Sequence, residues 1–223
     1  MINAVTLLKR KPGLSVEAFQ RHWRHEHAGV IARLPGVERY VQSHPLDENY
    51  ADREPACDGF AELWARDSQA FRDIAASEAY AAVLADEEKF LDRTANALVL
   101  TDVHVIRDGT VAADAIKRIR LFSRRPDLPV EVFQARWRDK YGPLMATLPS
   151  LDRYVQYHAR LGGYAHGRQP AYDGFDIAWF GSAHALREAM NSTVCARCRE
   201  AEKDFLVADG CPQILAREFV ILD

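Results

Sequence analysis

The sequence predicts an α+β fold: two ferredoxin-like βαββαβ domains whose antiparallel sheets pack face to face as an intrachain pseudo-dimeric α+β barrel. Three features lead to this prediction, namely an internal repeat, the order of strand-like and helix-like periods within each copy, and the short segment between the copies. The chain has 223 residues, of which 48% are hydrophobic and 27% are charged. This composition is typical of globular domains, and the length is sufficient for two of them.

The internal repeat is the strongest of these features. The segment LLKRKPGLSVEAFQRHWRHEH, which begins at Leu7, aligns with LFSRRPDLPVEVFQARWRDKY, which begins at Leu121, at an offset of 114 residues. The register continues through an R-Y-V-Q segment to His44 in the first copy and His158 in the second, and a one-residue shift then aligns two D-G-F segments. We therefore expect one domain at 1–107 and a second at 115–223.

Hydrophobic periodicity gives the order strand, helix, strand, strand, helix, strand in each copy. Short apolar runs predict the strands, and apolar residues at helical spacing from Val16 to Leu34 predict the first helix. Pro12-Gly13 and Pro35-Gly36 are turn signals at its two sides. In the first copy the expected strands are 4–10, 37–44, 59–64 and 97–106, and the expected helical segments are 15–34 and 68–90, the second of them broken near 75–78.

This element order places both helices on one face of a four-stranded antiparallel sheet. The other face of each sheet needs a cover, and a second sheet of the same kind is the simplest one. The segment 107–114 is too short to let the copies drift far apart. We therefore expect a pseudo-dimer within one chain, present as a monomer or as a homodimer of such chains.

Charge and composition argue against several partners. A net charge of −3 and a pI of about 6.2 disfavour nucleic acid. No apolar stretch is long enough for a membrane span, and the first residues are typical of a strand and a turn rather than a signal peptide, so a cytoplasmic location is expected. No phosphate-binding glycine loop is present, so no nucleotide cofactor is expected. The four cysteines, of which only one pair is closely spaced, predict buried thiols rather than a metal or redox site: Cys57, Cys195, Cys198 and Cys211.

The segment KPGLSVEAFQRHWRHEHAGVIARLPGVERYVQ resembles the core motif of the EthD domain family, within the dimeric α+β barrel superfamily, and RPDLPVEVFQARWRDKYGPLMATLPSLDRYVQ resembles it more loosely. The resemblance covers nearly the whole chain as a tandem pair. It implies a mostly apolar pocket between each sheet and its own helices. Family members are linked to the degradation of ethers and aromatic compounds, and relatives act on polyketides as decarboxylases, cyclases or isomerases without metal or organic cofactor.

Histidines on the first repeated helix are the leading site candidates. Helical spacing places His27 on the inner face beside Trp23, whereas His22 and His25 are expected to face solvent or a rim. A buried neutral imidazole can transfer protons to and from a carbon acid or phenol. The alternative is a structural hydrogen bond to a buried group. The H-x-x-H-x-H spacing also suggests a metal site, but a regular helix would divide these side chains between its faces.

The second copy differs at this position. Tyr141 takes the place of His27, and Arg136 takes the place of His22. A tyrosine can donate a hydrogen bond to a carbonyl oxygen, but its high reference pKa makes it a poor base near neutral pH. We therefore expect two unequal pockets, with the first copy as the active one.

Strand residues supply the remaining candidates. His44 and His158 end the second strand of each copy, where they either satisfy loop carbonyls or contact a ligand. Tyr40 shares the face of His44 because side chains alternate along a strand. Trp23 and Trp64 provide flat apolar area, either for core packing or for an aromatic ligand. The predicted catalytic residues are His27 and His44, and the predicted substrate-binding residues are Trp23, Tyr40, Trp64, Tyr141 and His158.

Together these features favour a cofactor-independent enzyme that acts by acid-base chemistry on a small hydrophobic aromatic or polyketide-like compound. Decarboxylation, cyclisation and isomerisation all fit such a site, and neither a metal nor an organic cofactor is expected. Two other classes stay open: a non-catalytic or stress-related barrel that binds a small ligand, and a cofactor-free monooxygenase. A shifted pKa of His27 and a pocket in front of it would favour the enzyme.

Overall fold

The computed structural model describes residues 1–207 and 211–223. These residues form two compact units. The first contains Met1–Pro45, Cys57–Leu100 and Glu218–Asp223, and the second contains Leu46–Ala56 and Thr101–Arg217. Each unit therefore consists mainly of one repeat. The exceptions are Leu46–Ala56 and the part of β4 (Ala97–Arg107) from Thr101 on, which belong to the second unit, and the part of β8 (Gln213–Leu222) from Glu218 on, which belongs to the first.

The first copy contains the predicted elements within two residues of their expected bounds. They are β1 (Ile2–Leu8), α1 (Val16–His22), η1 (Trp23–His27), α2 (Ala28–Ala32), β2 (Arg39–Pro45), β3 (Gly59–Ala65), α3 (Ser68–Ala76), α4 (Tyr80–Phe90) and β4. A 3-10 turn, η2 (Asp47–Tyr50), precedes β3. Ser15 accepts a hydrogen bond from Ala18 N at the start of α1, as a capping serine does. The break between α3 and α4 is confirmed.

The second copy repeats this order. Its elements are β5 (Ile116–Phe122), α5 (Val130–Arg136), η3 (Trp137–Tyr141), α6 (Gly142–Met145), β6 (Arg153–Ala159), η4 (Leu161–Gly167), β7 (Gly174–Phe180), α7 (Ala183–Asn191), α8 (Thr193–Glu202) and β8. Pro129 stands where Ser15 caps the first copy, so α5 begins without a side-chain cap.

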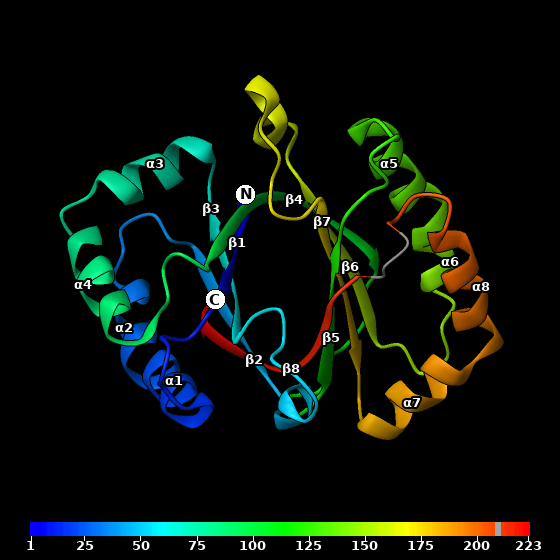
Figure 1. Cartoon of the computed structure of the whole chain (residues 1–223), viewed down its shortest axis with the longest axis horizontal. Helices are drawn as coiled ribbons and strands as arrows, with labels where there is room; N and C mark the ends of the chain where they lie inside the picture. Colours follow the sequence, from blue (N-terminus) through cyan, green and yellow to red (C-terminus); the bar gives the residue numbers. More distant parts are fainter. Residues whose placement is uncertain (208–210) are drawn as a thin grey trace. The chain divides into compact units, whose positions relative to one another are not determined.

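The strands pair antiparallel in the order β1-β3-β2-β8-β5-β7-β6-β4. Within the first unit, α1 to α4 lie on one side of β1, β3 and β2, and within the second unit α5 to α8 cover one side of β5, β7 and β6 (Figure 1). This is the strand order of an α+β barrel made from two ferredoxin-like βαββαβ copies. The predicted fold class is confirmed.

A buried aspartate joins β1 to β3 in the first copy. Asp58 accepts a hydrogen bond from Arg10 N at 2.9 Å, pairs with the Arg10 guanidinium and lies 3.2 Å from Lys9 Nζ. Asp173 takes the same place in the second copy, where it accepts from Arg124 N at 2.8 Å. The ion pair of Asp58 holds the strand ends together.

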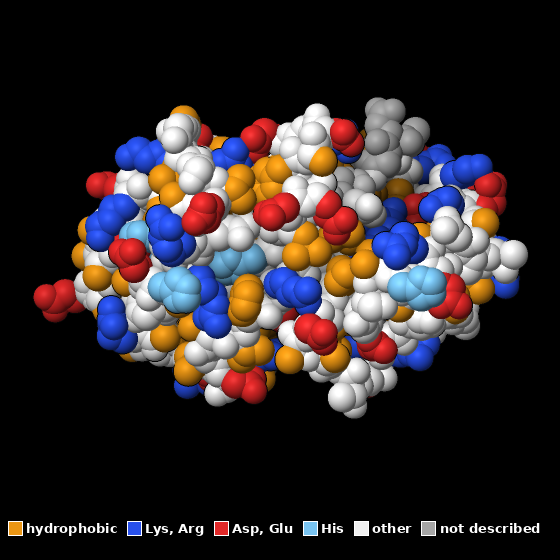
Figure 2. All heavy atoms as spheres, turned by 90° about the horizontal axis from the view of Figure 1, so that it is seen from below, with side chains coloured by type: hydrophobic (Ala, Val, Ile, Leu, Met, Phe, Trp, Pro, Cys, Tyr) orange, Lys and Arg blue, Asp and Glu red, His pale blue; other side chains and the backbone are white. Residues whose placement is uncertain are grey.

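The surface carries both signs of charge. In Figure 2, Lys and Arg side chains are interspersed with Asp and Glu side chains, and hydrophobic side chains lie between them. Across the described ranges 1–207 and 211–223, no helix has the length and apolar character that a bilayer crossing requires.

Candidate functional site

A cavity of about 350 Å³ lies between the sheet and the helices of the first copy. Its wall is mostly apolar or aromatic. The residues with hydroxyl, imidazole or charged groups that line it are Thr6, His27, Tyr40, Ser68, Arg72, Tyr80 and Glu87, and the large apolar and other aromatic ones are Leu8, Trp23, Ile31, Leu34, Leu63, Phe71, Ile74, Val83, Leu98 and Leu100. A mostly apolar wall with a few convergent polar groups is typical of a small-molecule site.

A π-helical turn, η1, places two histidines on one carboxylate. In this turn the chain bonds from residue i to residue i+5, so His22 and His27 lie on the same face of the helix. His27 Nδ1 lies 2.9 Å from Asp86 Oδ2, and His22 Nε2 lies 3.1 Å from both oxygens of Asp86. We expected His22 at the solvent or a rim. That expectation assumed a regular helix and was wrong, because His22 is partly buried against Asp86.

The electrostatics of this pair favour a neutral His27 beside an ionised Asp86. Burial lowers the pKa of His27 more than the hydrogen bond and the charge of Asp86 raise it. For Asp86, burial raises the pKa, but hydrogen bonds from His27, Lys89 and His22 together lower it. Because Nδ1 is the atom that meets the carboxylate, it carries the proton, and the free lone pair is on Nε2. His27 lines the cavity and is 4% exposed.

Tyr40 presents a hydroxyl with two incoming hydrogen bonds. Its oxygen accepts from Trp23 Nε1 at 3.0 Å and from Gln42 Nε2 at 2.9 Å. Burial is the main cause of a raised pKa, so the hydroxyl keeps its proton near neutral pH. Because both bonds are accepted, this proton is available to an acceptor in the cavity that Tyr40 lines.

His44 does not line the cavity. Its ring stacks on Trp23 with centroids 4.3 Å apart, and Nε2 lies 3.0 Å from Gln42 Oε1. Burial lowers the pKa of His44 to about 3, so the ring is neutral and donates to Gln42. His44 therefore acts on the cavity indirectly, through the stacked Trp23 ring and through Gln42 and Tyr40, as a group that orients others.

The two tryptophans of the first copy have different places. Trp23 is fully buried, lines the cavity and packs so closely over Gly59 that a Cβ there would lie 2.7 Å from its ring. Trp64 is buried beneath Arg39, whose guanidinium lies 4.9 Å from the ring centroid, and does not line the cavity. The structure thus brings His27, Trp23 and Tyr40 together, and leaves Trp64 and His44 outside.

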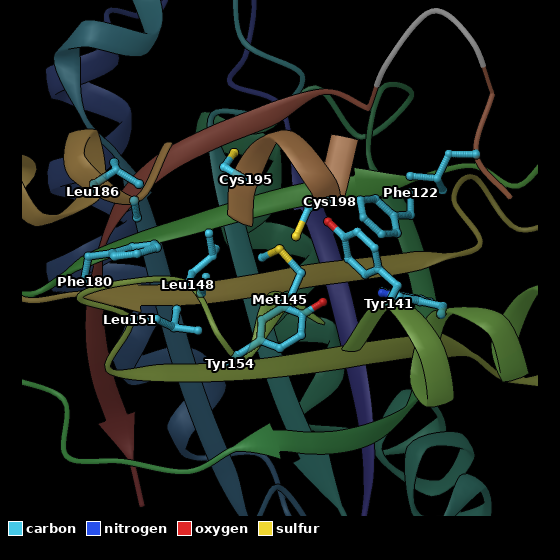
Figure 3. Packing of buried hydrophobic residues seen from close by; sticks show 14 of the residues in the cluster. Phe122, Tyr141, Met145, Leu148, Leu151, Tyr154, Phe180, Leu186, Cys195 and Cys198 are labelled. Atoms are coloured by element: carbon cyan, nitrogen blue, oxygen red, sulfur yellow. The ribbon is translucent and has the colours of Figure 1, made fainter. Parts of the chain in front are cut away.

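In the second copy the corresponding space is filled by side chains. Arg120 donates to Glu202 through Nη1 at 2.6 Å and Nη2 at 2.8 Å, and to Tyr141 Oη at 3.0 Å. Tyr141 in turn donates to Glu202 at 2.7 Å. Tyr154 donates to the buried Asp176 at 3.2 Å. Figure 3 shows Tyr141, Phe122, Met145 and Cys198 directed into one packed cluster.

The two candidate residues of the second copy belong to this packed interior. Tyr141 is 2% exposed and is held by Arg120 and Glu202. His158 repeats the arrangement of His44, because it stacks on Trp137 at 4.2 Å and lies 3.0 Å from Gln156 Oε1. Burial lowers its pKa to about 2.

Sequence reasoning missed two acidic residues of the site, Asp86 and Glu87. They belong to a D-E-E run near the end of α4, a pattern that is usually solvent-exposed. The signal that could have found them is the repeat itself. Asp86 aligns with Ala201, so the carboxylate is specific to the copy that has His27, whereas Glu87 aligns with Glu202 and is common to both copies.

Within residues 1–207 and 211–223, no group of three His, Cys, Asp or Glu side chains has the geometry of a metal site. The four cysteines are free thiols, and burial raises the pKa of Cys57 and Cys198 to about 12. Such thiols are weakly nucleophilic, as expected for packing residues.

Comparison with known proteins adds a family and a set of folds. No curated protein matches the chain. Among solved structures, an anthrone oxidase-like protein matches over 100% of this chain and 94% of its own, with 10% identity and a TM-score of 0.68. A provisionally named monooxygenase from Fusobacterium nucleatum subsp. nucleatum matches over 98% and 93% of the two chains, with 9% identity and a TM-score of 0.65. A mutant chlorite dismutase from Candidatus Nitrospira defluvii matches over 96% and 90%, with 8% identity and a TM-score of 0.51.

At these identities the structural matches show the fold alone. The family model described as the EthD domain is more specific, since it matches the chain twice, at residues 11–94 and 125–208. The protein therefore belongs to the EthD domain family, as a tandem duplication of that domain.

Proposed function

We propose that the first copy is a cofactor-independent acid-base site that moves a proton on a small hydrophobic carbonyl compound. The observation that carries this proposal is a neutral histidine, His27, held by the ionised Asp86 at the wall of a largely apolar cavity. The carboxylate fixes the tautomer and stabilises the imidazolium that forms when Nε2 takes up a proton.

The chemistry needs no further reactant. His27 Nε2 removes a proton from the carbon next to the carbonyl, and the C–H electron pair moves to the carbonyl oxygen as an enolate. Tyr40 donates its hydroxyl hydrogen to that oxygen, which is where negative charge develops. Return of the proton from His27 to another carbon gives isomerisation. In a decarboxylation His27 Nε2 first takes up the carboxyl proton of the substrate acid. The C–C bond to the carboxylate then supplies the electron pair to the carbonyl as carbon dioxide leaves, and the imidazolium returns its proton to the carbon.

The cavity sets the size of the compound. About 350 Å³ is near the lower end of the range for small-molecule sites, so a substrate with one or two rings fits better than a long chain. Trp23, Phe71 and Tyr80 supply flat apolar walls for such rings.

The experiment follows proton exchange by NMR in D₂O with 2-indanone, and carbon dioxide release from benzoylacetic acid, as two probes of carbon-acid chemistry. We expect the wild-type protein to accelerate at least one of them. His27→Asn should reduce that rate by roughly 100-fold or more, and Asp86→Asn by about tenfold, because the general base and its orienting carboxylate are removed in turn.

The matched control is His25→Asn, which changes an exposed histidine of the same helical segment and should leave the rate unchanged. Thermal unfolding of each variant checks that it is folded. Acceleration that survives His27→Asn, or wild-type protein that accelerates neither probe, contradicts the proposal and favours a barrel that binds its ligand without turnover.

A further inference from the structure

The second copy shows what the glutamate that both copies share can bind. Glu87 and Glu202 are equivalent by position, because each stands four residues before a leucine that forms an antiparallel β-bridge with an arginine. The two bridges are Leu91 with Arg10 and Leu206 with Arg124. Glu202 holds the Arg120 guanidinium through two parallel hydrogen bonds of 2.6 and 2.8 Å. Such bidentate geometry is among the strongest recognition modes of a carboxylate.

Strand register identifies what stands in the place of Arg120 in the first copy. Arg120 pairs across the sheet with Asp176, and at the equivalent register Thr6 pairs with Ala61. Thr6 and Ala61 both line the cavity. The first copy therefore has open space where the second has Arg120 and Asp176. It retains Glu87, the counterpart of the glutamate that binds the Arg120 guanidinium in the second copy.

Glu87 lacks an equally good partner inside its own copy. Burial, the largest cause, raises its pKa, Arg93 lowers it in part, and the nearby Asp86 raises it further. Arg93 Nε lies 3.4 Å from Glu87 Oε2, but the Arg93 side chain is 46% exposed and makes a single long contact. Arg72, at the edge of the cavity, donates to Gln69 at 3.0 and 2.5 Å instead.

The remaining walls also suit a cation. Trp23, Tyr40, Phe71 and Tyr80 line the same cavity. Aromatic faces attract a desolvated cation, and an apolar wall with one carboxylate favours a ligand that combines a ring with one positive group.

We propose that the cavity of the first copy binds a compound with a basic nitrogen, such as an amidinium or ammonium group on an aromatic body, and that Glu87 is its counter-ion in the place where Glu202 holds Arg120. This inference rests on the proposed function in one respect, since it names the substrate class of the same site. The His27 counterpart Tyr141 also contacts the Arg120 guanidinium, at 3.0 Å. The basic group would therefore bind within the site where His27 acts.

The test uses three probes of nearly equal size and different charge, namely benzamidine, benzamide and benzoate, with binding measured by titration calorimetry at pH 7.5. We expect benzamidine to bind at least tenfold more tightly than benzamide, and benzoate to bind more weakly than both. Glu87→Gln should remove the preference for benzamidine while it leaves the binding of benzamide nearly unchanged.

Two further variants make the test specific. Glu88→Gln changes the exposed neighbour of Glu87 and should keep the preference for benzamidine. Thr6→Arg recreates the internal ion pair of the second copy and should abolish benzamidine binding, whereas Thr6→Val, which adds no charge, should retain it. If Thr6→Arg does not fold, Glu87→Gln still decides the question.

The outcomes separate this inference from the proposed function. Equal affinity for benzamidine and benzamide, or a preference that survives Glu87→Gln, overturns the inference even if 2-indanone exchange depends on His27. Conversely, a Glu87-dependent preference supports the ligand class even if neither ketone probe is turned over, in which case only the proposed function fails.

Discussion

In the first copy, Thr6 and Ala61 face each other across the sheet and a cavity lies above them, whereas in the second copy Arg120 and Asp176 occupy the same register and fill the space. The backbone elements of the two copies agree closely, down to the π-helical turn in each first helix. The repeat thus provides an internal control, because residues that differ between the copies report on the site and residues that are shared report on the fold.

The shared residues form one unit in both copies. His44 with Gln42 and Trp23, and His158 with Gln156 and Trp137, make the same stack and the same hydrogen bonds. In each case the glutamine also donates to the tryptophan carbonyl inside the π-helical turn. Since this unit is also present in the copy in which side chains fill the space that corresponds to the cavity, its common role is to hold the turn against the second strand.

The largest effect is expected from Arg120→Met. The substitution leaves the carboxylates of Glu202 and Asp176 without their cation in a largely buried place. Removing one partner of a buried ion network typically costs about 3–5 kcal/mol, and we expect a loss of that order in the free energy of unfolding by urea.

Two variants sharpen this prediction. Arg125→Met removes an exposed pair with Asp127 and should cause no measurable change. Arg120→Met combined with Glu202→Gln removes the charge imbalance and should recover part of the loss, which a double-mutant cycle measures. If Arg120→Met alone costs less than about 1 kcal/mol, the network does not stabilise the second copy as described.

Much of the fold could be predicted from the sequence because local signals and the repeat agree. Pro12-Gly13 marks a turn in which Gly13 has a φ of +85°, and alternation identified the strands. The π-helical turn could not be predicted, because its five residues are compatible with an ordinary α-helix and the extra residue in the turn depends on how the helix packs. That turn is the reason that His22 was misplaced.

The site could be predicted only in part for a related reason. Hydrophobic periodicity identifies the inner face of the helix that carries Trp23 and His27 and of the strand that carries Tyr40, and all three residues line the cavity. His44 shares the sheet face of Tyr40, yet it stacks behind Trp23, because which residues along one face reach a cavity depends on the packing of the helix above. Asp86 comes from an element far along the chain, and periodicity carries no information on which distant helix meets His27.

An intermediate effect is expected from alanine at the two glycines beneath the tryptophans. A Cβ at Gly174 would overlap both the Trp137 ring and the backbone carbonyl of Tyr157, whereas at Gly59 the nearest atoms all belong to the Trp23 ring. A ring can shift more easily than a strand. We expect Gly174→Ala to cost about 3 kcal/mol and Gly59→Ala about 1–2 kcal/mol in urea unfolding.

The order of these two costs tests the comparison. Gly163→Ala, at a surface glycine of the second copy with no atom near the added Cβ, serves as the control and should change stability little. Equal costs at Gly59 and Gly174 would contradict this order, because they would mean that the overlap with the Tyr157 carbonyl adds nothing to the overlap with the tryptophan ring.

The smallest effect, counted per pH unit, is the loss of folding stability in acid, and it is expected in both copies. Burial is the largest cause of the low pKa of both His44 and His158, and nearby basic side chains lower it further, Arg24 and His25 in the first copy and His104 and Arg138 in the second. In the unfolded chain each histidine takes up a proton near pH 6.5, whereas in the folded chain it stays neutral until the pH approaches about 3 or about 2. The unfolded state therefore binds more protons as the pH falls below 6.5.

It follows that this contribution to stability is complete above pH 6.5 and is lost progressively as the pH falls toward 3. The expected slope is about 1.4 kcal/mol per pH unit for each histidine. His44→Gln and His158→Gln keep a polar side chain but cannot titrate, so each should flatten the dependence of unfolding free energy on pH between about 4 and 6 by that amount, even where the variant is less stable overall. Because both copies contain the same stack, the two variants should flatten it equally. A change in only one of them would mean that the histidine of the other copy is accessible to protons, and the shared structural role would then apply to one copy alone.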